Sequence, residues 1–279
     1  MIGHACDELL PGASLYKTLA GIGLCRRPDL LDRMVRVGAD VPRIPGGSGL
    51  SLTTDPVITT WRELMRWMLV GSDNTSAALI LQEIGTGAII RAAADAGMAS
   101  TTIAPTEQTI RRAVAARRQQ GAVSETSARS ASDAAPPISR AASLRADDAD
   151  DALLAYAKED RILGSLTTAA DQVRLMTALW QGRLLAPDFT ALVRTMLGQA
   201  APQRISRTIS YPGVQVAGKT GSWGPFRHHT AVVEHIDEPP VAVSVMTRSA
   251  DLDRLLPRVD DAIGEMAAIL VDAVRAELR

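Results

Sequence analysis

Lysine is rare in this chain, and two of its three lysines lie in short polar motifs. The sequence holds 27 arginines but only Lys17, Lys158 and Lys219. Arginine keeps its proton in proteins, whereas a lysine held near other charges or away from water can alternate between amine and ammonium. The use of lysine at positions 17 and 219 of an arginine-rich chain therefore suggests proton transfer.

Ser14 stands three residues before Lys17, in a segment that is predicted to be helical because apolar residues recur at near-helical spacing over residues 14–24. Residues three apart on a helix are neighbours. A serine in the first turn also places its own backbone N–H at the positive end of the helix dipole. The pair therefore predicts a nucleophile and its base beside part of an anion hole. The plain alternative is a serine N-cap followed by a solvated lysine.

Three motifs follow one another along the chain in the order S-x-x-K, S-D-N and K-T-G. They are Ser14 to Lys17, Ser72-Asp73-Asn74 and Lys219-Thr220-Gly221. This trio is the signature of class A β-lactamases and penicillin-binding proteins. On these residues the chain resembles the class A β-lactamase superfamily of serine hydrolases.

The resemblance implies a role for each residue of the first two motifs. Ser14 would attack the substrate, and Lys17 would accept its proton. Ser72 would pass a proton to the leaving nitrogen, and Asn74 would bind the amide of the substrate. Asp73 would be mainly a structural support.

The resemblance also implies that the K-T-G segment binds substrate. Lys219 and Thr220 would bind an anionic group such as a carboxylate. Gly221 completes the motif at the edge of the cleft, and the backbone N–H groups of Ser222 and Ser14 would form the oxyanion hole.

Arg227 is a further candidate for substrate binding, because its guanidinium could hold a carboxylate beside Lys219. His228, His229 and His235 lie close in sequence and raise the question of a metal site. No set of aspartates or cysteines joins them, so they are interpreted as strand and hairpin residues. The sequence implies no metal and no organic cofactor.

Glu107 lies 33 residues beyond Asn74, near the place where the family carries its deacylating glutamate. The family follows that glutamate with Leu-Asn, whereas Ile110-Arg111 stands here. The alternative is that Glu107 is a charged residue in the first turn of a helix. Without a base for water, attack by Ser14 would still occur, but hydrolysis of the resulting ester would be slow.

Helices predicted over residues 61–69 and 75–84 place the S-D-N motif in the turn between them. In that turn Ser72 is expected as the N-cap of the second helix and Asp73 as an acid in its first turn. Residues 119–151 are rich in Ala, Ser, Asp and Arg, which predicts a mobile insertion. Thr168 to Asp171 is typical of a capping box that opens another helix.

The last third of the chain changes to strand periodicity. Residues 214–218, 230–235 and 241–247 predict an antiparallel meander with Lys219 at the end of its first strand. We therefore expect an α+β fold, in which a mostly helical lobe over residues 1–205 packs against a small antiparallel sheet and a C-terminal helix over residues 206–279. The predicted buried stripe of that helix is Val259, Ile263, Met266, Leu270 and Val274.

Only 13 residues precede Ser14, whereas members of the family begin with a helix and two strands, so the N-terminal strands are apparently missing. In that fold those strands pair beside the last one, here residues 241–247. An exposed apolar edge there favours self-association or strand donation by a partner. The first residues lack a signal-peptide pattern, which indicates a cytoplasmic protein as the sequence is written, or an exported one if the natural N-terminus is longer.

The composition is that of a soluble globular protein, with 46% hydrophobic residues, 22% charged residues and a net charge of −1. Such a charge gives no attraction to nucleic acid or to membranes, and no apolar run is long enough to span a bilayer. Cys6 and Cys25 have neither metal-ligand nor disulfide-framework spacing.

The expected function is that of a serine hydrolase whose small-molecule substrates are β-lactams or related amides. Two alternatives stay open. One is a D,D-peptidase-like, esterase-like or acyl-transfer enzyme with slow deacylation, and the other is a degenerate, non-catalytic penicillin-binding module.

Overall fold

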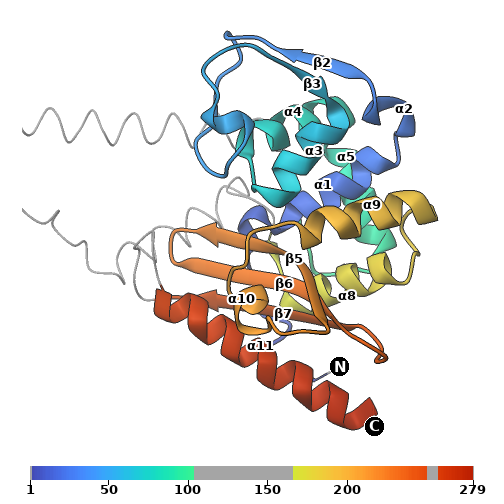
Figure 1. The fold of residues 1–279 in the computed structure, drawn as a ribbon, viewed down its shortest axis with the longest axis vertical. Coiled ribbons are helices and arrows are strands. Elements are labelled where there is room, and N and C mark those ends of the chain that lie inside the picture. The colour runs from blue at the N-terminus through green and yellow to red at the C-terminus, as the bar shows by residue number, and fades with distance from the viewer. Residues whose placement is uncertain (1, 104–165, 250–256, 279) are drawn as a thin grey trace, which may run out of the picture.

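A three-stranded antiparallel sheet forms the centre of the fold, with helices packed on both of its faces (Figure 1). The computed structural model describes residues 2–103, 166–249 and 257–278. Glu107 and the insertion predicted at residues 119–151 therefore lie outside the described residues. The predicted α+β class is confirmed.

The sheet is the predicted meander, and its strands pair in the order β5-β6-β7. They are β5 Val214–Trp223, β6 Phe226–His235 and β7 Val241–Arg248. β5 and β6 run further than predicted because their polar residues also pair, with Lys219 opposite Thr230 and Ser222 opposite Arg227. Lys219 therefore lies in the middle of β5, so its predicted position at the strand end is wrong. The apolar pattern identified only the half of each strand that packs on a hydrophobic core.

Helix α11, Pro257–Leu278, covers one face of the sheet (Figure 1). Its buried residues are Ile263, Gly264, Ala267 and Val271, whereas Met266 is 41% exposed. The predicted stripe was wrong at Met266. The helix packs on the sheet through the small residues Gly264 and Ala267. The predicted stripe missed them because it was built from large apolar side chains.

Helices α1, α3, α4, α5 and α9 of the helical lobe are drawn above the sheet in Figure 1, α8 packs on β6 and β7, and the short helix α10 packs on α11. Buried Leu, Met and Ala side chains from these helices make one hydrophobic cluster, and β7 with α11 belongs to a second. The described elements outside the sheet and α11 are β1 Leu10–Pro11, the 3₁₀ helix η1 Ala13–Leu15, α1 Tyr16–Cys25, α2 Pro28–Leu31, β2 Met34–Val37, the 3₁₀ helix η2 Leu50–Leu52, β3 Val57–Thr60, α3 Trp61–Val70, α4 Asn74–Ile84, α5 Thr86–Asp95, β4 Leu166–Thr167, α8 Ala169–Trp180, α9 Pro187–Gly198 and α10 Ile205–Thr208.

Side-chain caps fix where the helices around the site begin. Thr60 accepts a hydrogen bond from the Glu63 N–H and opens α3, and Thr168 accepts one from the Asp171 N–H and opens α8, as its predicted capping box implied. Each such cap satisfies one of the free N–H groups in the first helical turn and typically stabilises a helix by about 1 kcal/mol.

The outer edge of β7 pairs with no strand among the residues that the structure describes. β7 carries no proline, lysine or glycine that would discourage pairing with another chain. Self-association through this edge stays a prediction, which sedimentation equilibrium would test.

No single helix in the described ranges is long and apolar enough to cross a membrane. Among these ranges, only α4 and α5 taken together have the length and apolar composition of a membrane span, and the two are bent by 89° at their junction. The division of the chain at residue 205 also stays a prediction.

Candidate active site

Ser14 lies in η1, the single 3₁₀ turn that leads into α1. The prediction placed Ser14 in the first turn of the helix itself, which begins two residues later at Tyr16. The turn is tight because Ala13 has a positive φ of 47° and the Leu15 N–H binds the Gly12 carbonyl at 3.0 Å. Within the described chain the half-buried hydroxyl of Ser14 makes no hydrogen bond, so it is free to meet a ligand.

Lys17 is fully buried in the first turn of α1, and its amino group reaches the S-D-N turn. Its Nζ donates to the Ser72 carbonyl at 2.5 Å and to Asn74 Oδ1 at 2.6 Å, and it lies 3.4 Å from Ser72 Oγ. Burial lowers the pKa of Lys17 well below its usual value, and the charge of Lys219 lowers it further, against the opposite effect of Asp73. The alternative of a solvated lysine is excluded by this burial.

Ser72 joins both motif lysines. Its backbone has a φ of 55°, in the left-handed region that a serine adopts only when its surroundings require it. In this conformation the carbonyl accepts from Lys17 while Oγ accepts from Lys219 Nζ at 2.9 Å. Ser72 thus lies between the amino groups of Lys17, its predicted partner in proton transfer, and Lys219, the predicted ligand of an anionic group.

Asp73, rather than Ser72, is the N-cap of α4. Its carboxylate accepts from the Ser76 N–H at 2.7 Å and from the Ser51 N–H at 2.6 Å, and the side chain is fully buried. The predicted cap at Ser72 is therefore wrong by one residue, because the left-handed backbone of Ser72 turns its side chain away from the helix. The supporting role expected for Asp73 matches these contacts.

Asn74 is held from both ends of its amide. Its Oδ1 accepts from Lys17, and its Nδ2 donates to the Pro45 carbonyl at 2.7 Å. The orientation of the amide is therefore set by a lysine on one side and by a backbone carbonyl on the other.

β5 passes directly against η1, and Gly221 makes this approach possible. A Cβ at position 221 would lie 2.8 Å from the Gly12 carbonyl oxygen and 3.3 Å from Leu15 Cγ, which is too close for an ordinary contact. β5 therefore runs alongside the turn that carries Ser14.

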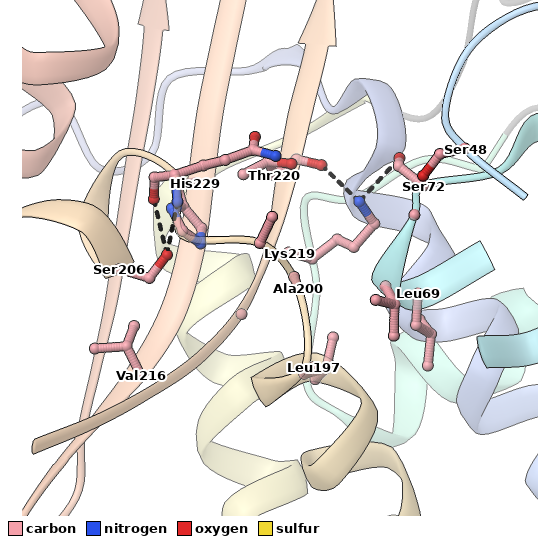
Figure 2. Close-up of a pocket in the computed structure, with 15 residues that line it drawn as sticks. Ser48, Leu69, Ser72, Leu197, Ala200, Ser206, Val216, Lys219, Thr220 and His229 are labelled. Carbon is pink, nitrogen blue, oxygen red and sulfur yellow. Dashed lines mark hydrogen bonds between the residues drawn. The ribbon is translucent and has the colours of Figure 1, made fainter. Parts of the chain in front are cut away.

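Lys219 is 3% exposed, and its Nζ also donates to the Thr220 carbonyl at 3.1 Å (Figure 2). Burial lowers its pKa to about 7, with a smaller contribution from the charge of Arg204. Lys219, Thr220 and Ser72 line a cavity of about 120 Å³ that continues towards Ser48, Ser206 and His229 (Figure 2).

Arg204 is a residue of the site that the sequence did not reveal. Its guanidinium is 4% exposed and donates to Ser222 Oγ at 2.6 Å, to the Gly221 carbonyl at 3.0 Å and to Asp260 at 2.6 Å, and it also binds the His228 carbonyl. The residue lies in the loop before α10, among 27 arginines and outside any periodic pattern, so no sequence signal distinguished it.

Arg227, the predicted carboxylate ligand, donates to the carbonyls of Gly224 at 2.6 Å and Phe226 at 2.8 Å and is 4% exposed. These bonds brace the turn between β5 and β6. Its contact with substrate stays a prediction, whereas a hydrogen bond of the Arg204 guanidinium does reach Gly221 of the K-T-G segment.

His228 and His229 lie on β6, as predicted for strand residues, and both are buried. His228 Nδ1 accepts from the Thr247 N–H at 3.2 Å, so its Nε2–H donates to the Pro11 carbonyl at 2.8 Å. Burial lowers the pKa of His228 to about 4 and that of His229 to about 3. His228 therefore ties the sheet to the segment that precedes Ser14.

The comparisons with known proteins agree with this geometry. A model of the family described as Beta-lactamase enzyme family matches residues 2–274. No curated protein sequence matches the chain.

Solved structures of β-lactamases and of PBP-A share the fold. The β-lactamase from Sphaerobacter thermophilus DSM 20745 is 19% identical with a TM-score of 0.71, over 98% of this chain and 86% of that chain. A class A β-lactamase from Mycobacterium abscessus is 19% identical with a TM-score of 0.68, over 98% and 88% of the two chains. PBP-A is 15% identical with a TM-score of 0.67, over 97% and 83%. At these identities the likeness establishes the fold.

Proposed function

Because the family model spans nearly the whole chain, the chain belongs to the Beta-lactamase enzyme family, and we propose that it forms an acyl-enzyme at Ser14 with β-lactams or related amides. The observation that best supports the proposal is the convergence of Lys17 and Lys219 on Ser72, beside the turn that carries Ser14. Two buried amines at one serine hydroxyl are costly to fold and are typical of a proton-transfer site.

The state of Lys17 supports its role as the base. Its two shortest hydrogen bonds go to the Ser72 carbonyl and to Asn74 Oδ1, and a longer one of 3.4 Å goes to Ser72 Oγ. Burial lowers the pKa of Lys17 well below its usual value, which favours the amine, whose lone pair can act as a base. Ser14, three residues earlier on the same turn of chain, is the hydroxyl that this lone pair can deprotonate.

The proposed reaction is an acyl transfer in which the proton lost by Ser14 is matched by the proton gained by the leaving nitrogen. Ser14 Oγ bonds to the carbonyl carbon of the amide while its proton passes to Lys17 Nζ. The negative oxygen is stabilised by the N–H groups of Ser14 and Ser222. The C–N bond then breaks, the nitrogen takes the hydroxyl proton of Ser72, and Ser72 is reprotonated from Lys17 or Lys219.

The charge around the cleft supports an anionic substrate. Lys219 and Arg204 are both buried at the K-T-G segment, and Asp260 is the acidic partner bound to Arg204 there. A substrate carboxylate beside Lys219 and Thr220 would supply the missing negative charge in a poorly hydrated place, where charge-assisted hydrogen bonds are strongest.

Intact-protein mass spectrometry after exposure to penicillin G tests the proposal. We expect a mass increase equal to one whole penicillin G molecule, because the opened ring stays attached, and we expect peptide mapping to place it on Ser14. The Ser14→Ala variant, checked for native circular dichroism, should gain no mass. An unmodified wild-type protein, or an adduct that persists in Ser14→Ala, would contradict the proposal.

A second candidate is slow deacylation, and it is favoured by the state of the two carboxylates that are fully buried in the described residues. Among the described residues, Asp73 accepts two backbone N–H groups, and Asp171 binds the Ser100 N–H, the Thr101 hydroxyl and Arg174. Neither is free to activate water. The lifetime of the adduct decides between the candidates, since rapid loss indicates a β-lactamase and persistence indicates a D,D-peptidase-like or acyl-transfer enzyme. The Glu107→Gln variant tests whether Glu107 sets that lifetime.

A further inference from the structure

The loop Pro45–Gly49 lies against the S-D-N turn, and its central glycine touches the backbone of Ser72. We propose that Gly47 is a positioning residue, which holds the Ser72 carbonyl in the place where Lys17 binds it. The inference rests on the proposed function in so far as Lys17 is the base for acylation.

Backbone hydrogen bonds attach the loop on both sides of Ser72. Before Ser72, the Ser48 N–H donates to the Gly71 carbonyl at 2.8 Å. After it, the Asn74 N–H donates to the Gly46 carbonyl at 3.3 Å, and the Asn74 side chain donates to the Pro45 carbonyl at 2.7 Å. The loop therefore follows the S-D-N turn closely and cannot move away from it without breaking these bonds.

Gly47 fills the gap between these anchors and leaves no room for a side chain. Its φ is 79°, and a Cβ there would lie 2.3 Å from the Ser72 carbonyl oxygen and 2.7 Å from the Asp73 Cα. Both neighbours are backbone atoms, so no flexible side chain can give way. The loop backbone at Gly47 therefore lies close against the carbonyl that Lys17 binds.

This contact matters because the conformation of Ser72 is itself unfavourable. A non-glycine residue with a φ of 55° costs about 1–3 kcal/mol and persists only where its surroundings impose it. The loop on one side and Lys17 on the other hold the Ser72 carbonyl in this conformation. If the carbonyl shifts, Lys17 loses an acceptor at 2.5 Å and the direction of its lone pair changes.

The perturbation is Gly47→Ala, and Gly85→Ala is its matched control. Gly85 has a similar φ of 74°, but no atom lies within 4 Å of the place that a methyl group would take, so its alanine variant carries the backbone strain without the steric contact. Gly46→Ala is a milder second variant, because its methyl would meet only the amide end of Asn74, at 2.5 Å.

The first measurement is the single-turnover acylation rate with penicillin G across pH. A displacement of about 1 Å in a catalytic group can slow a reaction on the order of 100-fold, and we expect a loss of that size in Gly47→Ala. A carbonyl acceptor favours the ammonium over the amine, so its loss should lower the pKa of Lys17 and move the acid limb of the profile to lower pH. Asp73 and Lys219 are the charged groups that face Lys17, and a shift of Asp73 away from Lys17 would lower the pKa of Lys17 in the same direction. Gly85→Ala should keep the wild-type rate and profile.

The second measurement needs no substrate. The chain has three lysines, so lysine labelled with carbon-13 gives three side-chain signals, and the one missing in Lys17→Met belongs to Lys17. In Gly47→Ala, and less strongly in Gly46→Ala, this signal should titrate at lower pH than in wild type and Gly85→Ala. Equal titration of Lys17 in all four folded proteins would overturn the inference, and so would equal acylation rates. A wild type that is never acylated would instead refute the proposed function, and the titration would still decide the role of Gly47.

Discussion

Replacing Arg204 with alanine should destabilise the protein far more than replacing its neighbour Arg207. Both arginines bind consecutive aspartates of α11, Arg204 to Asp260 and Arg207 to Asp261. They differ in their surroundings, because the Arg204 side chain is 4% exposed, whereas those of Arg207 and Asp261 are 52% and 57% exposed. The two substitutions therefore compare a buried network with a surface pair on the same two elements.

The expected size follows from what each substitution leaves behind. Arg204→Ala leaves Asp260 without its arginine and the carbonyls of Gly221 and His228 without this donor. Asp260 is 33% exposed, so solvent partly compensates for its lost partner, but a buried acceptor left without its donor typically costs about 1–3 kcal/mol. An exposed pair such as Arg207–Asp261 contributes less than about 1 kcal/mol.

Urea unfolding followed by tryptophan fluorescence measures both free energies of unfolding, and the slope with urea shows whether unfolding stays two-state. Arg204→Ala,Asp260→Ala should lose less than the sum of the two single variants, because the partners are coupled. If Arg204→Ala lost no more than Arg207→Ala, the buried network would contribute nothing measurable and the reasoning would be refuted.

Three further outcomes are expected. Lys17→Met should slow acylation by about two to four orders of magnitude, the usual contribution of a general base, while leaving a folded protein; a rate within tenfold of wild type in quenched-flow mass spectrometry would exclude Lys17 as the base. His228→Gln should make the stability of the fold less sensitive to acid. The pKa of His228 is lowered to about 4 in the folded protein, so between pH 6.5 and 4 only the unfolded chain takes up this proton. About 3 kcal/mol of stability that is present above pH 6.5 is therefore lost as the pH falls in wild type. Denaturant titrations at pH 7 and pH 4.5 check this, and an unchanged difference between the two would count against it. Gly221→Ala should slow acylation because its methyl meets the Gly12 carbonyl at 2.8 Å, whereas Gly198→Ala, with Ala217 Cβ at 3.7 Å, should not; equal rates in stopped-flow assays would show that the contact of β5 with η1 is unimportant.

The motif residues could be predicted from sequence because their chemistry is local. Ser14 and Lys17 are three residues apart, and Ser72 to Asn74 are adjacent, so backbone geometry alone brings each set together. The antiparallel meander was predictable for the same reason, since strand periodicity and turns are short-range signals.

The missed features depend on contacts between distant segments. Arg204 becomes part of the site because it meets Ser222 on β5 and Asp260 on α11, which are 18 and 56 residues away. The cap at Asp73 follows directly after Ser72, and the proposed positioning role of Gly47 acts on the Ser72 carbonyl. Both therefore depend on the backbone conformation of Ser72. No propensity predicts a left-handed serine, because tertiary contacts select it.

The bond between Lys219 and Ser72 joins the sheet to the helical lobe at the place where chemistry is proposed. Any motion that separates the two walls of the cleft must first sever it. Loss of turnover should therefore precede the loss of the helical circular dichroism signal as denaturant is added. A bound acyl group that contacts both sides of the cleft should raise the denaturant concentration at which both losses occur.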